Sequence, residues 1–434
     1  MFSRFGKAAF RLRQVWLAPW FLPMLFSVVA VVTVVAAYIS ARFAPQDLPF
    51  TIDHGALQSI LTILGSSMLT IAVFSLSTLV GAVSRASEAT TSHAVPLIVQ
   101  DRTAQTPISV FIGAFLYSIL GIIGLSSGIY SDAGRLILFL VTLVVVVVVV
   151  AALIRWIGHT ARIGRIGETI RLVEHAATHA MQTLEERPHF GCRVRRGEVP
   201  DGRFVRAIEA GYLQHFDLGA LHAITEDREV SIHLLVWPGA QILKDMDIAV
   251  LVGAAKDEDE EAVREGITIG QARTFEFDPD YGISTLAEIG SRALSPAVND
   301  TGTALDVIGA LVRVMAAAPK AFIDGDDDPH YPQLTLPPIS PDDYLATAFR
   351  ALARDGGDKA EIVLRIGRGL VWLSRFEVYR EGAESMLAEL RARALSSLTF
   401  QGDRVRVENK LADLKARYWA GSSSPSSPAI SGSK

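Results

Sequence analysis

Four long apolar runs dominate the first 160 residues of the chain. They lie near residues 20–40, 57–83, 107–130 and 135–158. A helix needs about 20 apolar residues to cross the hydrocarbon core of a bilayer. Backbone polar groups in lipid must be hydrogen-bonded within the segment, which favours helices even for the valine-rich fourth run. The pattern predicts four transmembrane α-helices within residues 1–158.

The periodicity changes after the fourth run. Over residues 159–187, apolar side chains recur every three or four positions, which indicates an amphipathic helix. The positions are Ile163, Ile166, Ile170, Val173, Ala177 and Met181. We expect this segment to form a stalk that continues the fourth span.

The rest of the chain divides into three parts. Residues 188–254 carry short strand-like segments around the turn dipeptide Pro238-Gly239, which predicts a small β-rich unit. Residues 255–400 are mainly helical in pattern, interrupted by a proline- and aspartate-rich loop with room for one short strand. Residues 401–434 are expected to hold a helix end and a disordered serine-proline tail. The predicted fold class is a membrane protein with four transmembrane α-helices followed by an α+β cytoplasmic domain.

Composition and charge agree with a membrane protein. Half of the residues are hydrophobic and mean hydropathy is +0.32. Basic residues precede the first run and follow the fourth, namely Arg4, Lys7, Arg11, Arg13, Arg155, Arg162 and Arg165. The positive-inside rule therefore places both termini in the cytoplasm. A cleaved signal peptide is the alternative for the first run, but that run is longer than a usual signal segment.

The formal net charge gives no support for a nucleic-acid-binding protein, and the cysteine count rules out a disulfide within the chain. A net charge of −5 offers no basic face for nucleic acid. Cys192 is the only cysteine, so no disulfide can form within the chain, as is typical of a reduced compartment. The expected partners are the lipid bilayer and further copies of the chain.

Hydroxyl side chains recur along one face of the second apolar run. They are Ser59, Thr62, Ser66, Thr70, Ser77 and Ser84. Hydroxyls on one helix face can line a water-filled path and replace part of the hydration of an ion. Small residues in lipid also serve close helix packing, and that alternative stays open.

Two further clusters have metal-ligand character, but neither predicts a metal site. His175 and His179 share a helix face, yet no third ligand is near them in the sequence. The acidic segment 324–330 lacks the alternating acids and closing glutamate of a calcium loop. No metal and no cofactor are expected.

The segment RALSPAVNDTGTAL, residues 292–305, gathers polar side chains between two apolar helical segments. With its leader it supplies six candidates for ligand binding or assembly: Gln271, Arg273, Asp278, Ser295, Asn299 and Asp300. No histidine lies between His233 and His330 to act as a base, and no phosphate loop is present. The segment is expected to be a corner in which Pro296 ends one helix and Asn299 or Asp300 caps the next.

The string IGQARTFEFDPDYGISTLAEIGSRALSPAVNDTGTALDVIGAL, residues 269–311, resembles the signature block of a bacterial family of predicted membrane proteins, domain of unknown function 2254. The segment AVPLIVQDRTAQTPISVFIGAFLYSIL and the Pro238-Gly239 hairpin share the resemblance. Ala297, Val298 and Thr301 stand where the family pattern usually has glycine, isoleucine and proline. The resemblance implies a bacterial inner-membrane protein with a cytoplasmic domain and implies no reaction.

These patterns favour an oligomeric inner-membrane channel or permeation protein for ions or small solutes, assembled or gated by its cytoplasmic domain. The alternative is a membrane-anchored sensor or scaffold whose cytoplasmic domain binds a ligand or a protein. An enzyme is the least favoured class, because no catalytic constellation is recognisable.

Overall fold

The protein divides into two compact units, Arg11–Thr169 and the remainder, to which Met1–Phe10 and Ile170–Lys434 belong. The computed structural model describes residues 10, 12, 14–16, 18, 20–40, 53–128, 130, 132–160, 165–322 and 329–419. Arg4, Lys7, Arg11 and Arg13 of the basic leader, the acidic residues 324–328 and the tail beyond residue 419 lie outside the described residues.

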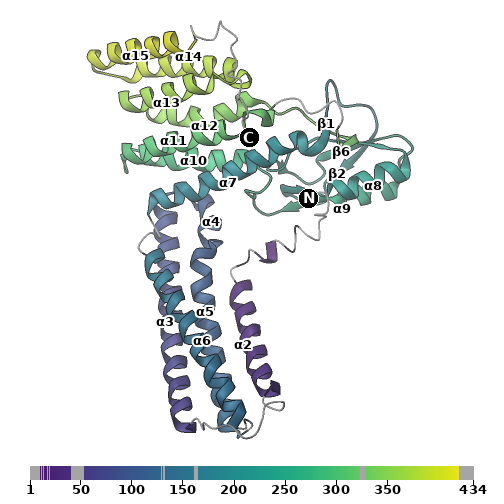
Figure 1. The fold of residues 1–434 in the computed structure, drawn as a ribbon. Helices are drawn as coiled ribbons and strands as arrows, with labels where there is room; N and C mark the ends of the chain where they lie inside the picture. The colour runs from purple at the N-terminus through teal and green to yellow at the C-terminus, as the bar shows by residue number, and fades with distance from the viewer. Residues whose placement is uncertain are drawn as a thin grey trace, which may run out of the picture. The chain divides into compact units, whose positions relative to one another are not determined.

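The first unit is built from apolar helices (Figure 1). They are α2 (Phe21–Ser40), α3 (His54–Ala89), η2 (Ser92–Ala94), α4 (Val95–Val99), α5 (Arg102–Ser126) and α6 (Asp132–Thr160). Asp53 caps α3 by accepting a 2.8 Å hydrogen bond from the Ala56 amide, and Asp101 caps α5 in the same manner. These caps begin the helices a few residues before the apolar runs themselves.

Three of these helices are long and apolar enough to cross a membrane. The spans are His54–Glu88, Arg102–Ser126 and Gly134–Thr160. Helix α2 occupies the first apolar run, but its apolar stretch among the described residues, Phe21–Ala36, is shorter than the about 20 residues of a span. The sequence predicted four spans, and three are supported.

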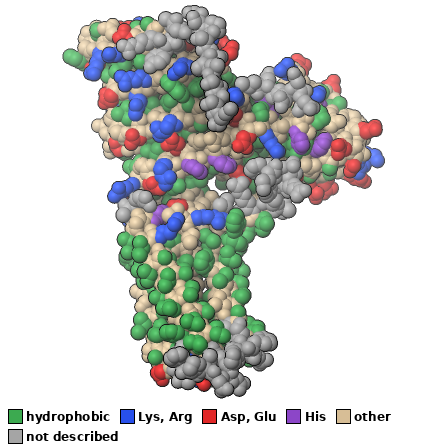
Figure 2. Space-filling view, in the orientation of Figure 1, with side chains coloured by type: hydrophobic (Ala, Val, Ile, Leu, Met, Phe, Trp, Pro, Cys, Tyr) green, Lys and Arg blue, Asp and Glu red, His purple; other side chains and the backbone are tan. Residues whose placement is uncertain are grey.

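Helix α5 is the centre of the first unit and packs against α2, α3 and α6. Glycines bring the backbones close, because a Cβ at Gly65 would lie 3.2 Å from the Ser118 side chain and one at Gly121 would lie 3.2 Å from Leu61. The Tyr117 hydroxyl lies 3.0 Å from the Thr142 hydroxyl and ties α5 to α6. Hydrophobic side chains cover the outside of these helices (Figure 2), as lipid requires.

The second unit contains a β-rich part and a helical part. Its β-rich part holds η3 (Pro188–Gly191), β1 (Cys192–Val194), β2 (Arg203–Arg206), β3 (Gly211–Phe216), α8 (Leu218–Arg228), β4 (Ser231–Leu234), β5 (Gln241–Ile242), β6 (Asp247–Val252), α9 (Asp257–Gly266), β7 (Ile267–Gly270) and β8 (Tyr331–Leu336). The strands form a five-stranded sheet of order β1-β8-β4-β6-β2 and a three-stranded sheet of order β5-β3-β7. Their inward side chains, such as Ile232, Leu251 and Leu334, form one core.

Strand β8 enters the five-stranded sheet from a segment far along the chain from its neighbours β1 and β4. It pairs in parallel with both β1 and β4, whereas β4, β6 and β2 pair antiparallel. The β-rich part therefore extends past residue 254 through β7 and β8, although residues 255–400 are otherwise helical as their pattern predicts.

The helical part is a stack of helices (Figure 1). It comprises α7 (Ile166–Glu186), α10 (Pro279–Leu294), α11 (Thr301–Ala317), η4 (Pro319–Phe322), α12 (Pro341–Asp355), α13 (Ala360–Leu373), η5 (Glu377–Tyr379), α14 (Arg380–Ser397) and α15 (Gln401–Trp419). Helix α10 packs against α11 and α12, and the pattern continues through α13, α14 and α15. The last helix runs to Trp419, further than the helix end expected after residue 401.

Helix α7 is held against this stack. A Cβ at Gly282 of α10 would lie 2.5 Å from Ala177, so the two helices meet through small residues. Arg313 of α11 donates two hydrogen bonds of 2.6 and 2.9 Å to the Glu174 carboxylate. Within the range 159–187 predicted as one amphipathic helix, α7 covers Ile166–Glu186, residues 159–160 end α6, and residues 161–164, with Ile163, lie outside the described residues. Part of the apolar face of α7 is buried against α10.

Candidate functional site

The hydroxyl face of α3 points away from the helices of its own unit. Its members are Ser59, Thr62, Ser66, Thr70, Ser77 and Ser84, and all six are exposed. The opposite face of α3, with Leu57, Leu61 and Leu64, is buried. Because Gly65 makes the close contact with α5, the hydroxyl face takes no part in that packing.

Three of the six hydroxyls on this face donate hydrogen bonds within the helix. Thr62 donates to the Gln58 carbonyl at 2.8 Å, Ser66 to that of Thr62 at 2.9 Å, and Thr70 to that of Ser66 at 3.0 Å. A hydroxyl that donates in this way still has acceptor lone pairs. The face therefore presents a row of hydrogen-bond acceptors without any charge.

The six signature-block candidates are divided by the length of α10, which at 16 residues is about 24 Å. Arg273 and Asp278 lie at its start, and Ser295, Asn299 and Asp300 lie at its end. Gln271 is exposed before the helix. One composite site from all six is therefore ruled out by distance.

At the start of α10, Arg273 and Asp278 form a bidentate ion pair with N···O distances of 2.7 and 2.8 Å. Asp280 adds a third bond of 3.0 Å to Arg273. Burial opposes the charge of Arg273, but the two carboxylates outweigh it and raise the pKa of the guanidinium. Asp278 also accepts from the Tyr281 amide at 3.0 Å and so caps α10.

This ion pair also fixes the Pro238-Gly239 turn. Gly239 has φ 94°, and a Cβ there would lie 2.1 Å from the Asp278 carboxylate oxygen. Only glycine fits this approach without displacement. Arg273, Asp278 and Gly239 therefore join the β-rich part to the helical part. The polar atoms of Arg273 and Asp278 are used for this contact.

At the end of α10 the chain turns a corner. Asp300 caps α11, with one carboxylate oxygen 3.0 Å from the Thr303 amide and the other 2.6 Å from the Thr303 hydroxyl. These bonds lower the pKa of Asp300. Ser295 donates to the Arg292 carbonyl at 2.7 Å, and Asn299 adopts a left-handed φ of 48°. The capping role expected for Asp300 is thus observed.

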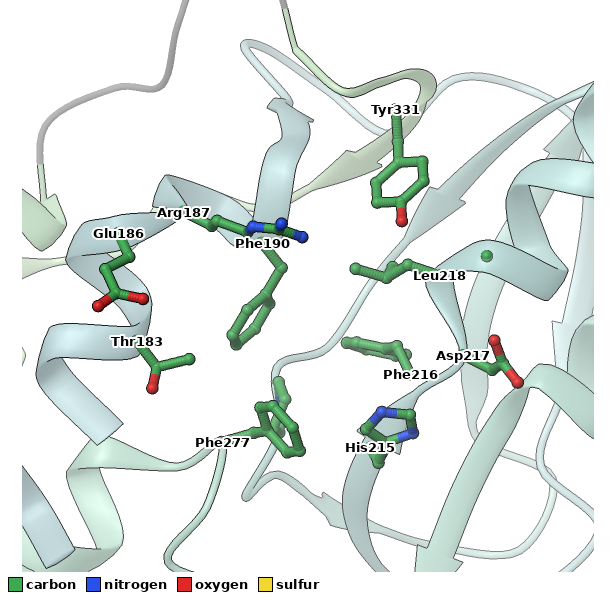
Figure 3. Close-up of a pocket in the computed structure, with 12 residues that line it drawn as sticks. Thr183, Glu186, Arg187, Phe190, His215, Phe216, Asp217, Leu218, Phe277 and Tyr331 are labelled. Atoms are coloured by element: carbon green, nitrogen blue, oxygen red, sulfur yellow. The ribbon is translucent and has the colours of Figure 1, made fainter. Parts of the chain in front are cut away.

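Sequence reasoning missed a pocket in the second unit (Figure 3). Its volume is about 100 Å³. The end of α7, the β3–α8 connection, Pro238, Phe277 and Tyr331 line it. No local spacing could reveal a site assembled from such distant segments, although the aromatic residues before β1 were a weak signal.

The chain belongs to the predicted membrane protein family DUF2254. The family model matches residues 18–370, which is most of the chain and includes the hydroxyl face of α3, both ends of α10 and every residue of the pocket. No curated protein and no solved structure matches the chain significantly. Membership in DUF2254 and the apolar helices identify a membrane protein, and the family description names no activity.

Proposed function

We propose that this protein is an oligomeric permeation protein in which the hydroxyl faces of several α3 helices surround a path for ions or small polar solutes. The observation that carries the proposal is the exposure of all six hydroxyl residues on α3, opposite its packed face. A random distribution of hydroxyl residues along the span would not place all six on one outward face over 26 residues.

The chemistry of the face fits a narrow aqueous path. Its hydroxyl oxygens can accept hydrogen bonds from water or coordinate a cation, as the oxygen rings of selective pores do. Between Ser59 and Ser84 no charged residue interrupts it. An acceptor-rich, uncharged face favours cations and neutral polar solutes over anions.

An enclosed path requires self-association. The hydroxyl face looks away from the α2, α5 and α6 helices of its own unit, so one protomer cannot surround it. Membrane oligomers of one chain are commonly cyclic, and cyclic symmetry brings the same helix of each copy to the axis. Exposed apolar neighbours such as Ile63 and Phe74 would then pack against adjacent copies.

The proposed setting is the bacterial inner membrane, with four spans and both termini in the cytoplasm. Its support is the family, the basic residues that flank the first and fourth apolar runs, and the positive-inside rule. Under this proposal α2 also crosses the membrane, which brings the number of spans from three to four. A reporter that is active only outside the cytoplasm tests it, because fusions after residues 45 and 131 should be active and one after Trp419 inactive.

Flux through reconstituted liposomes tests permeation itself. The full chain should pass K⁺ or glycerol, and Ser66→Leu should strongly reduce the flux by placing a bulky apolar group in the path. Ser67→Leu is the matched control, because Ser67 is also exposed but lies about 100° further around the helix. Absence of flux, or equal losses in both variants, would contradict the proposal.

A membrane-anchored sensor is the second candidate. The pocket between the end of α7 and the β-rich part favours it, since a ligand there would contact both parts of the second unit. No reaction is proposed for the signature block, because its carboxylates serve as caps and ion-pair partners. Turnover that disappears with Asp300→Asn would overturn that assignment.

A further inference from the structure

We propose that the pocket at the end of α7 binds a small molecule that has a ring-sized apolar body and a single carboxylate. This inference does not depend on the permeation proposal. The pocket is distinct from the α3 face and from the α10 corner, and its walls and polar groups come from side chains that neither site uses.

The walls of the pocket are suited to an apolar, planar body. Phe190, Phe216 and Phe277 point toward the cavity from three directions, and His215 lies beside Phe277 with ring centroids 5.1 Å apart (Figure 3). The cavity of about 100 Å³ is somewhat smaller than the cavity of about 150 Å³ that takes up benzene in an engineered protein. The enclosed volume therefore has room for no more than a single ring, and a polar arm of the ligand would lie at the pocket mouth.

The backbone is strained where it places one of these walls. His189, Phe190 and Gly191 have φ values of 51°, 55° and 82°, so three consecutive residues are left-handed. Non-glycine residues in this region cost on the order of 1–3 kcal/mol each, and such strain is concentrated at functional sites. The turn directs the Phe190 ring into the cavity and packs it 5.6 Å from the Trp237 ring.

Arg187 supplies the positive charge at the edge of the pocket. Its guanidinium is directed toward the cavity (Figure 3), and it makes no side-chain hydrogen bond or ion pair within the described part of the chain. A guanidinium with all donors available matches a carboxylate in a bidentate arrangement. It is half-buried, so a ligand carboxylate there would be partly shielded from water.

Tyr331 supplies the second polar contact. Its hydroxyl points into the cavity, and burial raises the pKa of Tyr331, so the O–H stays protonated and can donate. His215 adds no charge at neutral pH, because burial lowers its pKa to about 4. The polar groups that face the cavity therefore include one cation, the neutral Tyr331 hydroxyl and the uncharged His215 ring.

Nearby carboxylates limit the ligand to one negative charge. Asp217 caps α8 by accepting a 3.1 Å hydrogen bond from the Ala220 amide, and its carboxylate is directed away from the cavity (Figure 3). Glu186 also points away. Because Asp217 already compensates the helix end, a doubly charged phosphate would meet more repulsion than a monocarboxylate.

Calorimetric titration of the full chain in detergent with 4-fluorophenylacetate tests the site, with the neutral 4-fluorophenylacetamide as its isostere. The acid should bind at least about tenfold more tightly than the amide, as a charge-assisted pair implies. Arg187→Gln should remove that preference, and Tyr331→Phe should weaken binding of the acid by a smaller factor. Arg193→Gln, which changes an exposed arginine on β1, should behave like the unmodified protein.

Three results would overturn the proposal. They are equal binding of the acid and the amide, binding of neither at millimolar concentration, and equal effects of Arg187→Gln and Arg193→Gln. Fluorine line broadening of the same probe gives a second readout, and thermal unfolding of each variant verifies that it is folded. Loss of liposome flux in Ser66→Leu has no bearing on this binding, so the two proposals fail independently.

Discussion

The hydroxyl face of α3 and the corner between α10 and α11 use similar side chains in opposite ways. At the corner, each carboxylate oxygen of Asp300 accepts a hydrogen bond from Thr303, and these two bonds hold the first turn of α11. On α3, Thr62, Ser66 and Thr70 donate within the helix but leave their acceptor lone pairs exposed. Residue type alone therefore does not identify a site, because the hydrogen-bonding capacity left after folding decides what a polar side chain can bind.

The largest loss of stability is expected for a change of Arg273, which makes three hydrogen bonds to Asp278 and Asp280. Arg273→Ala should lower the free energy of unfolding by about 3–5 kcal/mol, because it leaves the buried Asp278 carboxylate without its ion-pair partner. Thermal and denaturant unfolding of the full chain in detergent measures this. Arg206→Ala, which removes an exposed ion pair with Asp247, should cost less than about 1 kcal/mol. Equal losses in the free energy of unfolding would contradict the distinction between buried, hydrogen-bonded polar groups and exposed ones.

A pH titration probes a second buried polar group. Burial lowers the pKa of His215 to about 4 from 6.5, so the unfolded chain binds the proton first as pH falls. Stability is fully present above pH 6.5 and is lost between pH 6.5 and 4, by on the order of 3 kcal/mol. His215→Phe, which keeps a ring beside Phe10, should lose less stability over this interval. An unchanged pH dependence in the variant would contradict the assignment to His215.

The corner should show a smaller effect. Asp300→Ala removes the cap of α11 and should cost about 1 kcal/mol, whereas Asp300→Asn, which still caps, should cost a few tenths. Circular dichroism during denaturant unfolding provides the measurement. A large loss of flux or ligand binding in Asp300→Asn, without a loss of stability, would show that the corner does more than end a helix.

The smallest stability effect is expected on α3. Ser66→Ala and Thr70→Ala should each change stability by less than about 0.5 kcal/mol, because both side chains are exposed and bond only their own helix. Liposome flux should nevertheless change in both variants. Flux and stability that are both unaltered would indicate that the hydroxyl face meets only lipid.

Sequence patterns predicted the features that depend on neighbouring residues. The apolar runs, the amphipathic helix before Pro188 and the cap at Asp300 all follow from local periodicity and hydrogen bonding. The parallel pairing of β8 with β1 and β4 did not follow, because β8 begins only at Tyr331, whereas β1 ends at Val194 and β4 at Leu234.

The candidate residues were only partly placed by the sequence. Arg273 and Asp278 are five positions apart and do pair, but Ser295 and Asn299 are separated from them by the whole of α10. The pocket depends on Arg187, His215 and Tyr331, which come together only when both sheets and α7 are assembled. The outward direction of the hydroxyl face could not be predicted either, because periodicity shows which residues share a face of α3 but not which face packs against α5.

Thiol modification on α3 tests the central claim most directly. Cys192 is the only cysteine and is buried, with its pKa raised by burial, so it should not react. A membrane-impermeant, charged methanethiosulfonate applied to reconstituted protein should modify Ser66→Cys and reduce flux, while Ser67→Cys stays unmodified. Modification of neither position, or of both at equal rates, would contradict a water-lined path along the hydroxyl face of α3.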